Sequence, residues 1–346
     1  MSKMSLNRNP KILILATGGT IASKSTDKGF VPQISGIELL QLIPEIANQT
    51  RVDVNQLMNI DSSDMQVSDW QKIARACQDA IEQKYSAIII THGTDTMCYT
   101  ASALSFLLPD LKIPIILTGS QKPAVLSDSD GPQNMKDAFC VANSKLKGVY
   151  IVFNHKIILG SRAYKMYTQN FDAYISRNYP YVGYVKDEKI EILTYPKILN
   201  SKNIPNQDVG QFELCPEVAL LKVTPATKPE FLSFIGKSGY QGIVIEGFGT
   251  GGISNLNHGM LDEIEHIISK RNIPIIMISQ CMYEGVNLAV YGVGDQAAKA
   301  GVISGNDMTT EIAIVKLMWL LARTKDMEQI KKAIAYNFCD EITDDL

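Results

Sequence analysis

Two short loops carry the hydroxyl side chains whose type and position could support nucleophilic chemistry. One loop, residues 16–22 (ATGGTIA), directly follows the mainly apolar run 11–15, and the other, residues 91–96 (THGTDT), directly follows the apolar run 87–90. Each run predicts a buried parallel strand. Because open α/β sheets bind ligands beyond the carboxyl ends of their strands, the loops predict a crevice for hydroxyl-based chemistry on a small molecule.

Thr20 is the leading candidate for the nucleophile. A threonine hydroxyl is weakly acidic and needs an activating partner, while Gly18 and Gly19 allow a sharp turn and the close approach of a substrate. The same loop also fits a phosphate-binding turn or a plain transition from strand to loop, although the GxxxxGK[ST] pattern of phosphate loops is absent. The loop alone leaves these alternatives open.

Thr94 and Asp95 form the second candidate pair. Asp95 would accept a hydrogen bond from a substrate ammonium, and Thr94 would activate or position a water molecule. The alternative for Asp95 is the N-cap of the following helix. Two threonine-rich loops at two strand ends favour the functional interpretation. For His92 we expect a structural role beneath the loop, because the GxSxG elbow of a serine hydrolase is absent.

Three further polar side chains follow predicted strands. Ser62 and Ser63 come after the strand-like segment 52–60, where small hydroxyls can hold a substrate carboxylate or simply form the turn into the next helix. Lys165 comes after the predicted strand 149–153, and a lysine near hydroxyls can act as a base. Since most lysines are solvated, the sequence alone leaves the role of Lys165 open.

The elements that must position these side chains alternate between strand and helix. We predict strands over 11–16, 86–91, 113–118 and 149–153 and helices over 70–84 and 97–108, the first helix with a capping box formed by Ser68 and Gln71. Crossovers of this kind predict a mainly parallel sheet with right-handed connections.

The length of 346 residues suits two domains. We predict an amino-terminal α/β domain over 10–197 that carries the candidate threonines, a linker rich in proline and asparagine over 198–216, and a smaller carboxyl-terminal α/β domain over 217–346. In the last of these we expect strands over 218–223, 242–246 and 274–279 and helices over 263–270 and 310–323, and we expect the final segment 327–336 to cover the sheet.

The composition excludes several functional classes. The hydrophobic fraction of 45% is ordinary, the net charge is only −3, and the basic residues are spread out, so we expect no nucleic-acid partner. No run approaches the ~20 apolar residues of a membrane span. The six cysteines lie far apart without a CxxC pair, which predicts reduced, packed thiols and no zinc site. Together these features favour a cytoplasmic enzyme without a metal or other cofactor.

The chain resembles the bacterial-type L-asparaginases, particularly the cytoplasmic type I group, from residue 11 to residue 343. The motifs that carry the resemblance are TGGTI at 17–21, HGTDT at 92–96 with YTASAL at 99–104, TGSQ at 118–121 and QCM at 280–282. The resemblance implies two α/β domains, hydrolysis of L-asparagine to L-aspartate and ammonia with minor glutaminase activity, no cofactor, and a homodimer or homotetramer.

The resemblance also implies a double displacement. Thr20 attacks the side-chain amide, ammonia leaves, and water opens the β-aspartyl ester. Backbone N–H groups near the second threonine would stabilise the oxyanion by about 3 kcal/mol per donor. The motif FDA at 171–173 fixes the register of Lys165, which bonds the second threonine. The other implied residues are the second threonine and its aspartate, Thr94 and Asp95, and the substrate-binding pair Ser62 and Ser63.

Two positions depart from the family pattern. Phe30, in the segment GFVP at 29–32, stands where the family carries a loop tyrosine whose hydroxyl approaches the first threonine. General acid–base catalysis worth ~10²–10⁴-fold is then at risk, unless water, Lys165 or another tyrosine supplies the proton. Glu246 stands where type I members use an arginine to hold a regulatory asparagine, so we do not expect that form of cooperativity.

Two other functions stay open as alternatives. The glutaminase-like subunit of a tRNA-dependent amidotransferase shares these motifs but is expected to need an amino-terminal module, and here only ten residues precede the first predicted strand. A weakly active or non-enzymatic asparagine-binding homologue would fit Phe30. The retention of Thr20, Thr94, Asp95 and Lys165 favours catalysis over pure binding.

Overall fold

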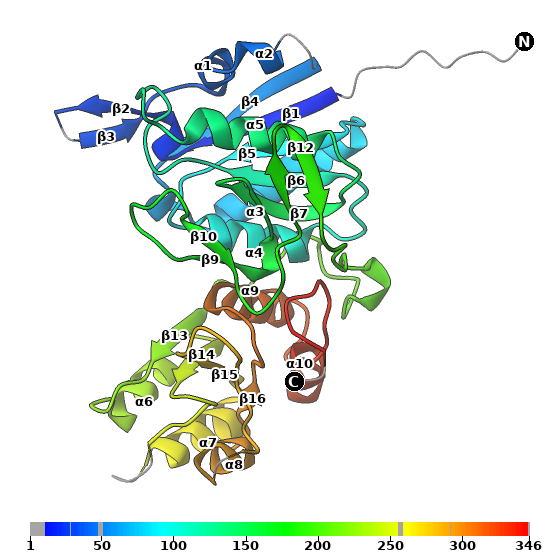
Figure 1. Cartoon of the computed structure of the whole chain (residues 1–346). Coiled ribbons are helices and arrows are strands. Elements are labelled where there is room, and N and C mark those ends of the chain that lie inside the picture. The colour runs from blue at the N-terminus through cyan, green and yellow to red at the C-terminus, as the bar shows by residue number, and fades with distance from the viewer. Residues whose placement is uncertain (1–10, 28, 48–50, 255–258, 291, 345–346) are drawn as a thin grey trace, which may run out of the picture. The chain divides into compact units, whose positions relative to one another are not determined.

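A computed structural model describes residues 11–27, 29–47, 51–254, 259–290 and 292–344 (Figure 1). The chain forms two compact units. Unit 1 comprises the chain up to Ala101, Leu111–Ile175 and Tyr181–Pro196, and unit 2 comprises Ser102–Asp110, Ser176–Pro180 and Lys197–Leu346. The segment 198–216, which the sequence predicts as a linker, lies in unit 2.

Unit 1 contains an eight-stranded sheet in the order β12-β11-β8-β7-β6-β5-β1-β4. The strands from β4 to β7 are parallel, and β8, β11 and β12 extend the edge in antiparallel pairs. The predicted mainly parallel sheet is therefore confirmed. The bounds are β1 (Lys11–Gly18), β4 (Arg51–Ile60), β5 (Ala87–Thr91), β6 (Pro114–Thr118), β7 (Gly148–Phe153), β8 (Lys156–Leu159), β11 (Gly183–Lys186) and β12 (Lys189–Ile192).

The parallel part of this sheet changes direction between β1 and β5. The chain passes from β1 to β4 on one side and then returns across β1 to β5 on the other. Every residue of β5, β6 and β7 is buried, as expected for strands covered on both faces. Such a reversal is the topological switch point at which open α/β sheets bind ligands. The two threonine-bearing loops follow the two strands that flank it.

Helices cover both faces of the sheet. Figure 1 shows α1 (Gly36–Gln41) and α5 (Gly131–Ala142) on one face and α3 (Val67–Glu82) and α4 (Met97–Leu107) on the other. The crossovers β5-α4-β6 and β6-α5-β7 step in the same direction across the sheet but use opposite faces, so they have opposite hands. The expectation of right-handed connections throughout is wrong for one of these two crossovers. A short α2 (Pro44–Ala47) follows α1.

The start of α3 differs from the prediction. Its N-cap is Gln66, whose backbone N–H donates to Asp69 Oδ2 at 2.9 Å, and Ser68 lies inside the first turn. The predicted capping box of Ser68 and Gln71 is therefore wrong. The observed pair, Gln66 and Asp69, and the predicted pair, Ser68 and Gln71, are each three residues apart. The helix begins at the earlier pair, which places the buried side chain of Trp70 in its first turn.

Two small hairpins complete unit 1. One pairs β2 (Ser23–Thr26) with β3 (Gly29–Pro32), and the other pairs β9 (Ala163–Lys165) with β10 (Tyr174–Ser176). Both hairpins, and the strands β8, β11 and β12, are absent from the sequence prediction. All of these strands are only three or four residues long, so they leave little periodic signal.

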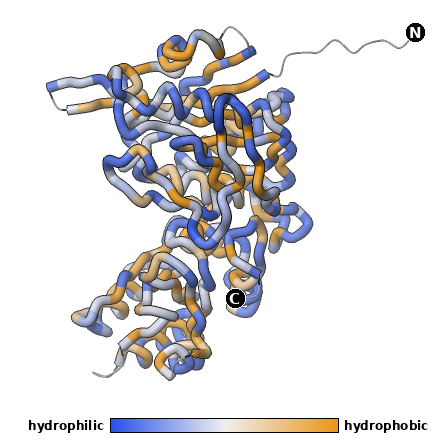
Figure 2. The backbone as a smooth tube through the Cα atoms, viewed as in Figure 1, coloured by the Kyte–Doolittle hydropathy of each residue, from blue (hydrophilic) through white to orange (hydrophobic). Residues whose placement is uncertain are grey.

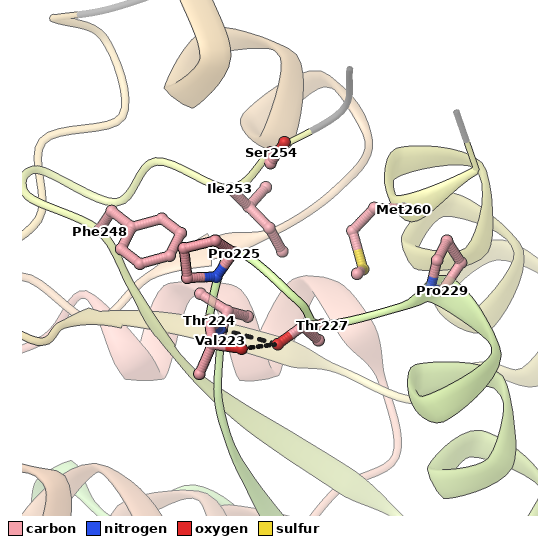
Figure 3. A pocket seen from close by; sticks show the side chains of 9 residues that line it. All are labelled: Val223, Thr224, Pro225, Thr227, Pro229, Phe248, Ile253, Ser254 and Met260. Atoms are coloured by element: carbon pink, nitrogen blue, oxygen red, sulfur yellow. Dashed lines mark hydrogen bonds between the residues drawn. The ribbon is translucent and has the colours of Figure 1, made fainter. Parts of the chain in front are cut away.

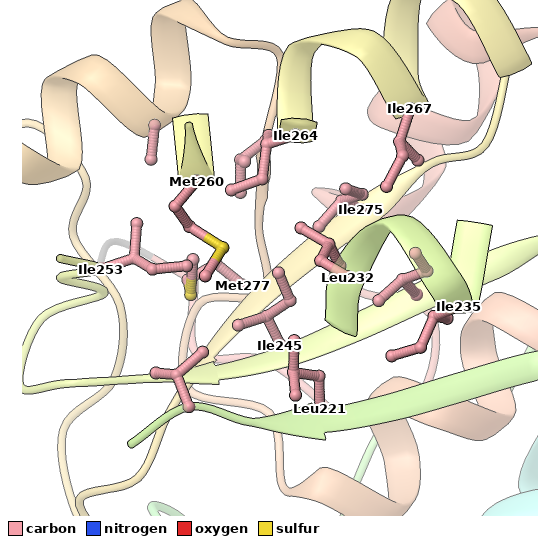
Figure 4. Close-up of a cluster of buried hydrophobic side chains, with 14 of the residues drawn as sticks. Leu221, Leu232, Ile235, Ile245, Ile253, Met260, Ile264, Ile267, Ile275 and Met277 are labelled. Carbon is pink, nitrogen blue, oxygen red and sulfur yellow. The ribbon is translucent and has the colours of Figure 1, made fainter. Parts of the chain in front are cut away.

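Unit 2 is built on a four-stranded parallel sheet, β13 (Val218–Lys222), β14 (Gly242–Gly247), β15 (Ile275–Ser279) and β16 (Ile303–Ser304). Helices α6 (Pro229–Lys237), α7 (Met260–Arg271) and α8 (Gly292–Lys299) contribute to one apolar core. Helix α9 (Thr310–Leu321) also packs on the sheet, and α10 (Met327–Ile334) packs on α9. Figure 4 shows the core, with Leu221, Ile245 and Ile275 from the strands facing Leu232, Ile235, Ile264 and Ile267 from the helices.

The apolar stretches of the chain, orange in Figure 2, run through the strands of both units. Each fully buried aliphatic side chain contributes about 1.5–3 kcal/mol to folding. The six cysteines are free thiols, and four of them are buried. Among the described residues, no helix combines the length and apolar character that a membrane crossing requires.

Candidate active site

The loop after β1 approaches the loop after β5 so closely that only glycine fits. Gly18 and Gly19 have φ values of 103° and 79°, in the region that favours glycine. A Cβ on Gly19 would overlap the Cα and N atoms of Gly93. The two backbones therefore touch at the residues that immediately precede Thr20 and Thr94. Thr20 is half-buried and opens a short 3₁₀ helix, Thr20–Ala22.

A third loop, the 3₁₀ helix Ser62–Asp64 after β4, closes on the same point. The Ser62 hydroxyl accepts the backbone N–H of Asp95 at 3.2 Å, and the Ser62 carbonyl accepts the hydroxyl of Thr96 at 2.7 Å. A Cβ on Gly93 would collide with the Ser62 side chain. Ser62 is 2% exposed. Its hydroxyl thus positions the loop after β5 and still has a proton to donate to a ligand.

Lys165 is brought to this point by β9. Its Nζ donates to Thr94 Oγ1 and to Asp95 Oδ1, each at 2.7 Å. The Lys165 side chain is 16% exposed and the Asp95 side chain is 66% exposed, so the three groups lie where a solute can reach them. A charged lysine can only donate, which leaves the Thr94 proton free to serve another group. A neutral lysine in the same place could instead accept that proton.

The predicted site residues do not all behave alike. Contacts join Ser62, Thr94, Asp95 and Lys165, and Thr20 follows the glycine that touches their loop. Ser63 is exposed, and both its hydroxyl and its N–H donate to the carboxylate of the preceding Asp61, at 2.7 and 2.8 Å. Because the Asp95 N–H already serves Ser62, it is not a free oxyanion donor in this conformation.

His92 has the structural role that we expected. It is fully buried, with Nδ1 2.7 Å from the Gly93 carbonyl and Nε2 2.8 Å from Thr100 Oγ1. Burial lowers the pKa of His92 to about 4, so the ring is neutral near pH 7. Since a carbonyl only accepts, Nδ1 carries the proton and Nε2 accepts from Thr100. The histidine therefore braces the loop rather than acting as a base.

Gln121 is a functional candidate that sequence reasoning left without a role. Its side-chain amide donates to the carbonyls of Tyr167 and Asn170 at 3.3 and 3.0 Å, and its backbone N–H donates to the Asp130 carboxylate at 3.0 Å. These bonds hold the loop that follows Lys165. The TGSQ motif marks Gln121 in the sequence, but nothing local shows that it reaches a loop 46 residues away.

The two positions that depart from the family pattern are both engaged locally. Phe30 is 56% exposed on β3, where it pairs with Ser25. Glu246 belongs to β14, where its carboxylate accepts the Thr310 hydroxyl at 2.6 Å and lies 3.6 Å from Lys222 Nζ. A carboxylate held in this way would repel the carboxylate of an amino-acid effector.

A hollow in unit 2, shown in Figure 3, lies at the carboxyl ends of β13 and β14, and the described residues that line it carry no ionisable side chain. Thr224 N–H donates to Thr227 Oγ1 at 2.7 Å, so these polar groups satisfy each other. Its lining residues are Val223, Thr224, Pro225, Thr227, Pro229, Phe248, Ile253, Ser254 and Met260, none of them ionisable. Across the part of the chain that the structure describes, no group of three or more His, Cys, Asp or Glu is arranged to hold a metal ion.

Fold and site together define the class: a two-unit α/β protein whose hydroxyl, carboxylate and lysine groups at a sheet switch point suit amide hydrolysis. Residues 11–197 match the family model "Asparaginase, N-terminal", and residues 217–334 match "Glutaminase/Asparaginase C-terminal domain". The chain therefore belongs to the asparaginase family, as its motifs predict.

Individual relatives agree with this assignment. The chain is 38% identical to the L-asparaginase of Thermococcus kodakarensis over 96% of this chain and 99% of that protein, whose solved structure matches with a TM-score of 0.87. It is 36% identical to a glutamyl-tRNA(Gln) amidotransferase subunit of Pyrococcus abyssi, over 96% of this chain and 77% of that protein. A probable cytoplasmic L-asparaginase from Campylobacter jejuni is 29% identical, with a TM-score of 0.82, over 94% of this chain and 99% of that one.

Proposed function

We propose that this protein hydrolyses L-asparagine to L-aspartate and ammonia, with minor activity on glutamine. The observation that carries the proposal is the pair of 2.7 Å bonds from Lys165 Nζ to Thr94 and Asp95, at the point where the loop before Thr20 touches the loop before Thr94. Similarity to the L-asparaginase of Thermococcus kodakarensis over nearly the whole of both chains supports the substrate.

In the first step the Thr20 hydroxyl attacks the carbon of the substrate's side-chain amide. As the new C–O bond forms, the Thr20 hydroxyl gives up its proton. The C–N bond of the tetrahedral intermediate then breaks, and the departing nitrogen takes up that proton and leaves as ammonia. Transfer of protons in this step is worth about 10²–10⁴-fold in rate. In the second step a water molecule, oriented by Thr94 and Lys165, attacks the ester carbon. The bond from that carbon to Thr20 breaks, a proton from the water returns to the Thr20 oxygen, and L-aspartate leaves.

The remaining residues orient the amino acid. The exposed carboxylate of Asp95 accepts the substrate ammonium while Lys165 holds its other side. The hydroxyls of Ser62 and Ser63 serve the substrate carboxylate, for which Ser63 has to turn away from Asp61. Holding both ends of the substrate places the amide carbon for attack, which is how orientation lowers a barrier.

Ammonia release from asparagine and from glutamine by wild type, Thr20→Ala and Thr20→Ser tests the proposal. We expect release by wild type, almost none by Thr20→Ala, and partial release by Thr20→Ser, which keeps a hydroxyl. Full activity in Thr20→Ala would show that another group is the nucleophile. Absence of ammonia from wild type on both substrates would favour a binding protein instead.

A second candidate is the glutaminase-like subunit of a tRNA-dependent amidotransferase. Relatives that carry the amidotransferase name cover 96% of this chain, so the motifs alone do not separate the two functions. The ratio of kcat/KM for the two amides separates them. A preference for asparagine supports the asparaginase, and a preference for glutamine supports the amidotransferase component.

We also propose a cytoplasmic location and a homodimer or homotetramer that works without a cofactor, a nucleic acid or a membrane. The neighbour whose title reads "Probable Cytoplasmic L-asparaginase" supports the location. Sedimentation of the purified protein measures the assembly, and a monomer under assay conditions would contradict it.

A further inference from the structure

Thr94 is held at two points by one hairpin. Lys165 on β9 bonds the Thr94 hydroxyl, and Tyr174 on the paired strand β10 donates its phenol to the Thr94 carbonyl at 2.5 Å. The side chain and the backbone of a single residue are therefore fixed by two neighbouring strands. The separation between Thr94 Oγ1 and Lys165 Nζ then depends on this hairpin rather than on the loop after β5 alone.

The Tyr174 phenol is well placed to hold a fixed position. The residue is 1% exposed, and its ring packs edge-on against Phe153 with centroids 5.0 Å apart and planes at 64°. Burial raises the pKa of Tyr174 well above its ordinary value, so the phenol is protonated and donates near pH 7. A rigid buried donor on a backbone carbonyl restrains the peptide plane that carries Thr94.

We propose that Tyr174 is a positioning residue for amide hydrolysis, holding the Thr94 peptide so that the Thr94 hydroxyl stays within reach of Lys165. The inference rests on the proposed function, because only that function assigns Thr94 and Lys165 a role in hydrolysis. Tyr174 does not contact the substrate. Its contribution is geometric, and a misplacement of about 1 Å in a reacting group can cost up to 10²-fold in rate.

The chain offers a matched control for this position. Tyr150 on β7 is also 1% exposed and also donates its phenol to a backbone carbonyl, that of Lys147, at 2.5 Å. Tyr174→Phe and Tyr150→Phe each remove the phenol bond to a backbone carbonyl and leave the ring in place. We expect similar losses of stability in urea unfolding. We expect kcat for asparagine to fall about tenfold in Tyr174→Phe only, with KM within about twofold of wild type.

A second measurement tests whether Tyr174 acts through Lys165. In a Lys165→Ala background the distance that Tyr174 maintains no longer matters, so Tyr174→Phe should lower the residual kcat less than about twofold. A full further tenfold loss would overturn the proposal. So would equal values of kcat in Tyr174→Phe and Tyr150→Phe, which would mean that the phenol contributes stability alone.

Failure of this inference is distinguishable from failure of the proposed function. If wild type releases no ammonia from asparagine or glutamine, the proposed function fails and the positioning role fails with it. If wild type is active and Tyr174→Phe matches Tyr150→Phe, the proposed function stands and only the role of Tyr174 is refuted.

Discussion

Replacing Lys165 by methionine should separate activity from stability. The side chain makes two 2.7 Å bonds, but one partner, Asp95, is 66% exposed. Ion pairs open to solvent contribute about 0–1 kcal/mol to folding, so the free energy of unfolding should change by no more than that. Loss of a proton-transfer group should lower kcat by about 10²–10⁴-fold, equivalent to about 3–5 kcal/mol of activation free energy.

Two further variants sharpen the comparison. Lys165→Arg keeps the positive charge but cannot act as a base near pH 7, so it should lose nearly as much kcat as the methionine variant. Lys11 is the control, because it is 27% exposed and pairs at 2.7 Å with the carboxylate of Asp53, at the start of β1 rather than in the loop that follows it. Lys11→Met should change stability by a similar amount and kcat far less.

The measurements are kcat and KM from ammonia release on asparagine and the midpoint of urea unfolding for each variant. A Lys165→Met enzyme with the wild-type kcat would refute the role of the lysine in proton transfer. A Lys165→Arg enzyme with the wild-type kcat would show that Lys165 acts by charge alone. If both methionine variants lost kcat and stability to the same extent, the fall in kcat would reflect a loss of folded protein rather than a loss of proton transfer.

Four more outcomes are expected. Burial lowers the pKa of His92 from 6.5 to about 4, so between these pH values the unfolded chain binds a proton that the folded chain does not. The free energy of unfolding should therefore fall by about 3 kcal/mol as the pH drops from 6.5 to about 4. Urea unfolding of His92→Gln should lack this dependence on pH, and the same dependence in the variant would contradict the assignment. Lys316 is fully buried and pairs with Glu341 at 2.7 Å, so Lys316→Met should lower the free energy of unfolding by about 3–5 kcal/mol. Lys299 pairs with Asp295 at the surface, so Lys299→Met should lower it by at most about 0.5 kcal/mol. Equal losses in the two variants would show that burial of the pair does not set its contribution. Phe30→Tyr should raise kcat by up to about 10²-fold, and an unchanged kcat would show that the hydroxyl is dispensable or already replaced. Saturation by asparagine should be hyperbolic because Glu246 presents a carboxylate to any amino-acid effector, and a sigmoidal curve would argue the opposite.

The central strands were predictable because burial on both faces leaves continuous apolar runs. The segments 87–90 and 114–117 show no polar alternation, and the observed strands β5 and β6 begin and end within a residue of the prediction. Gly18 and Gly19 predict a sharp turn and a close approach, and the structure shows that Gly19 lies against Gly93 of the second loop. The opposite hands of the crossovers through α4 and α5 were not predictable, since nothing in the residues of either helix states which face of the sheet it covers.

The polar part of the site was predictable only where it follows a strong strand. Thr20, Ser62 and Thr94 lie two or three residues beyond the ends of β1, β4 and β5, so strand prediction and the switch-point rule predict that they lie close together. Lys165 is the last residue of the three-residue strand β9, which is too short to leave a periodic pattern, and its register is predicted only by the family resemblance.

Tyr174 shows the same limit more sharply. Its sequence neighbours give no sign that its phenol reaches a carbonyl 80 residues earlier. That contact exists because β9 and β10 pair with each other and Phe153 fixes the ring, neither of which leaves a local pattern. When a site is assembled from loops whose partners are 70–80 residues apart, the sequence shows the candidate nucleophile, but only the three-dimensional structure shows the groups proposed to position the neighbouring residues.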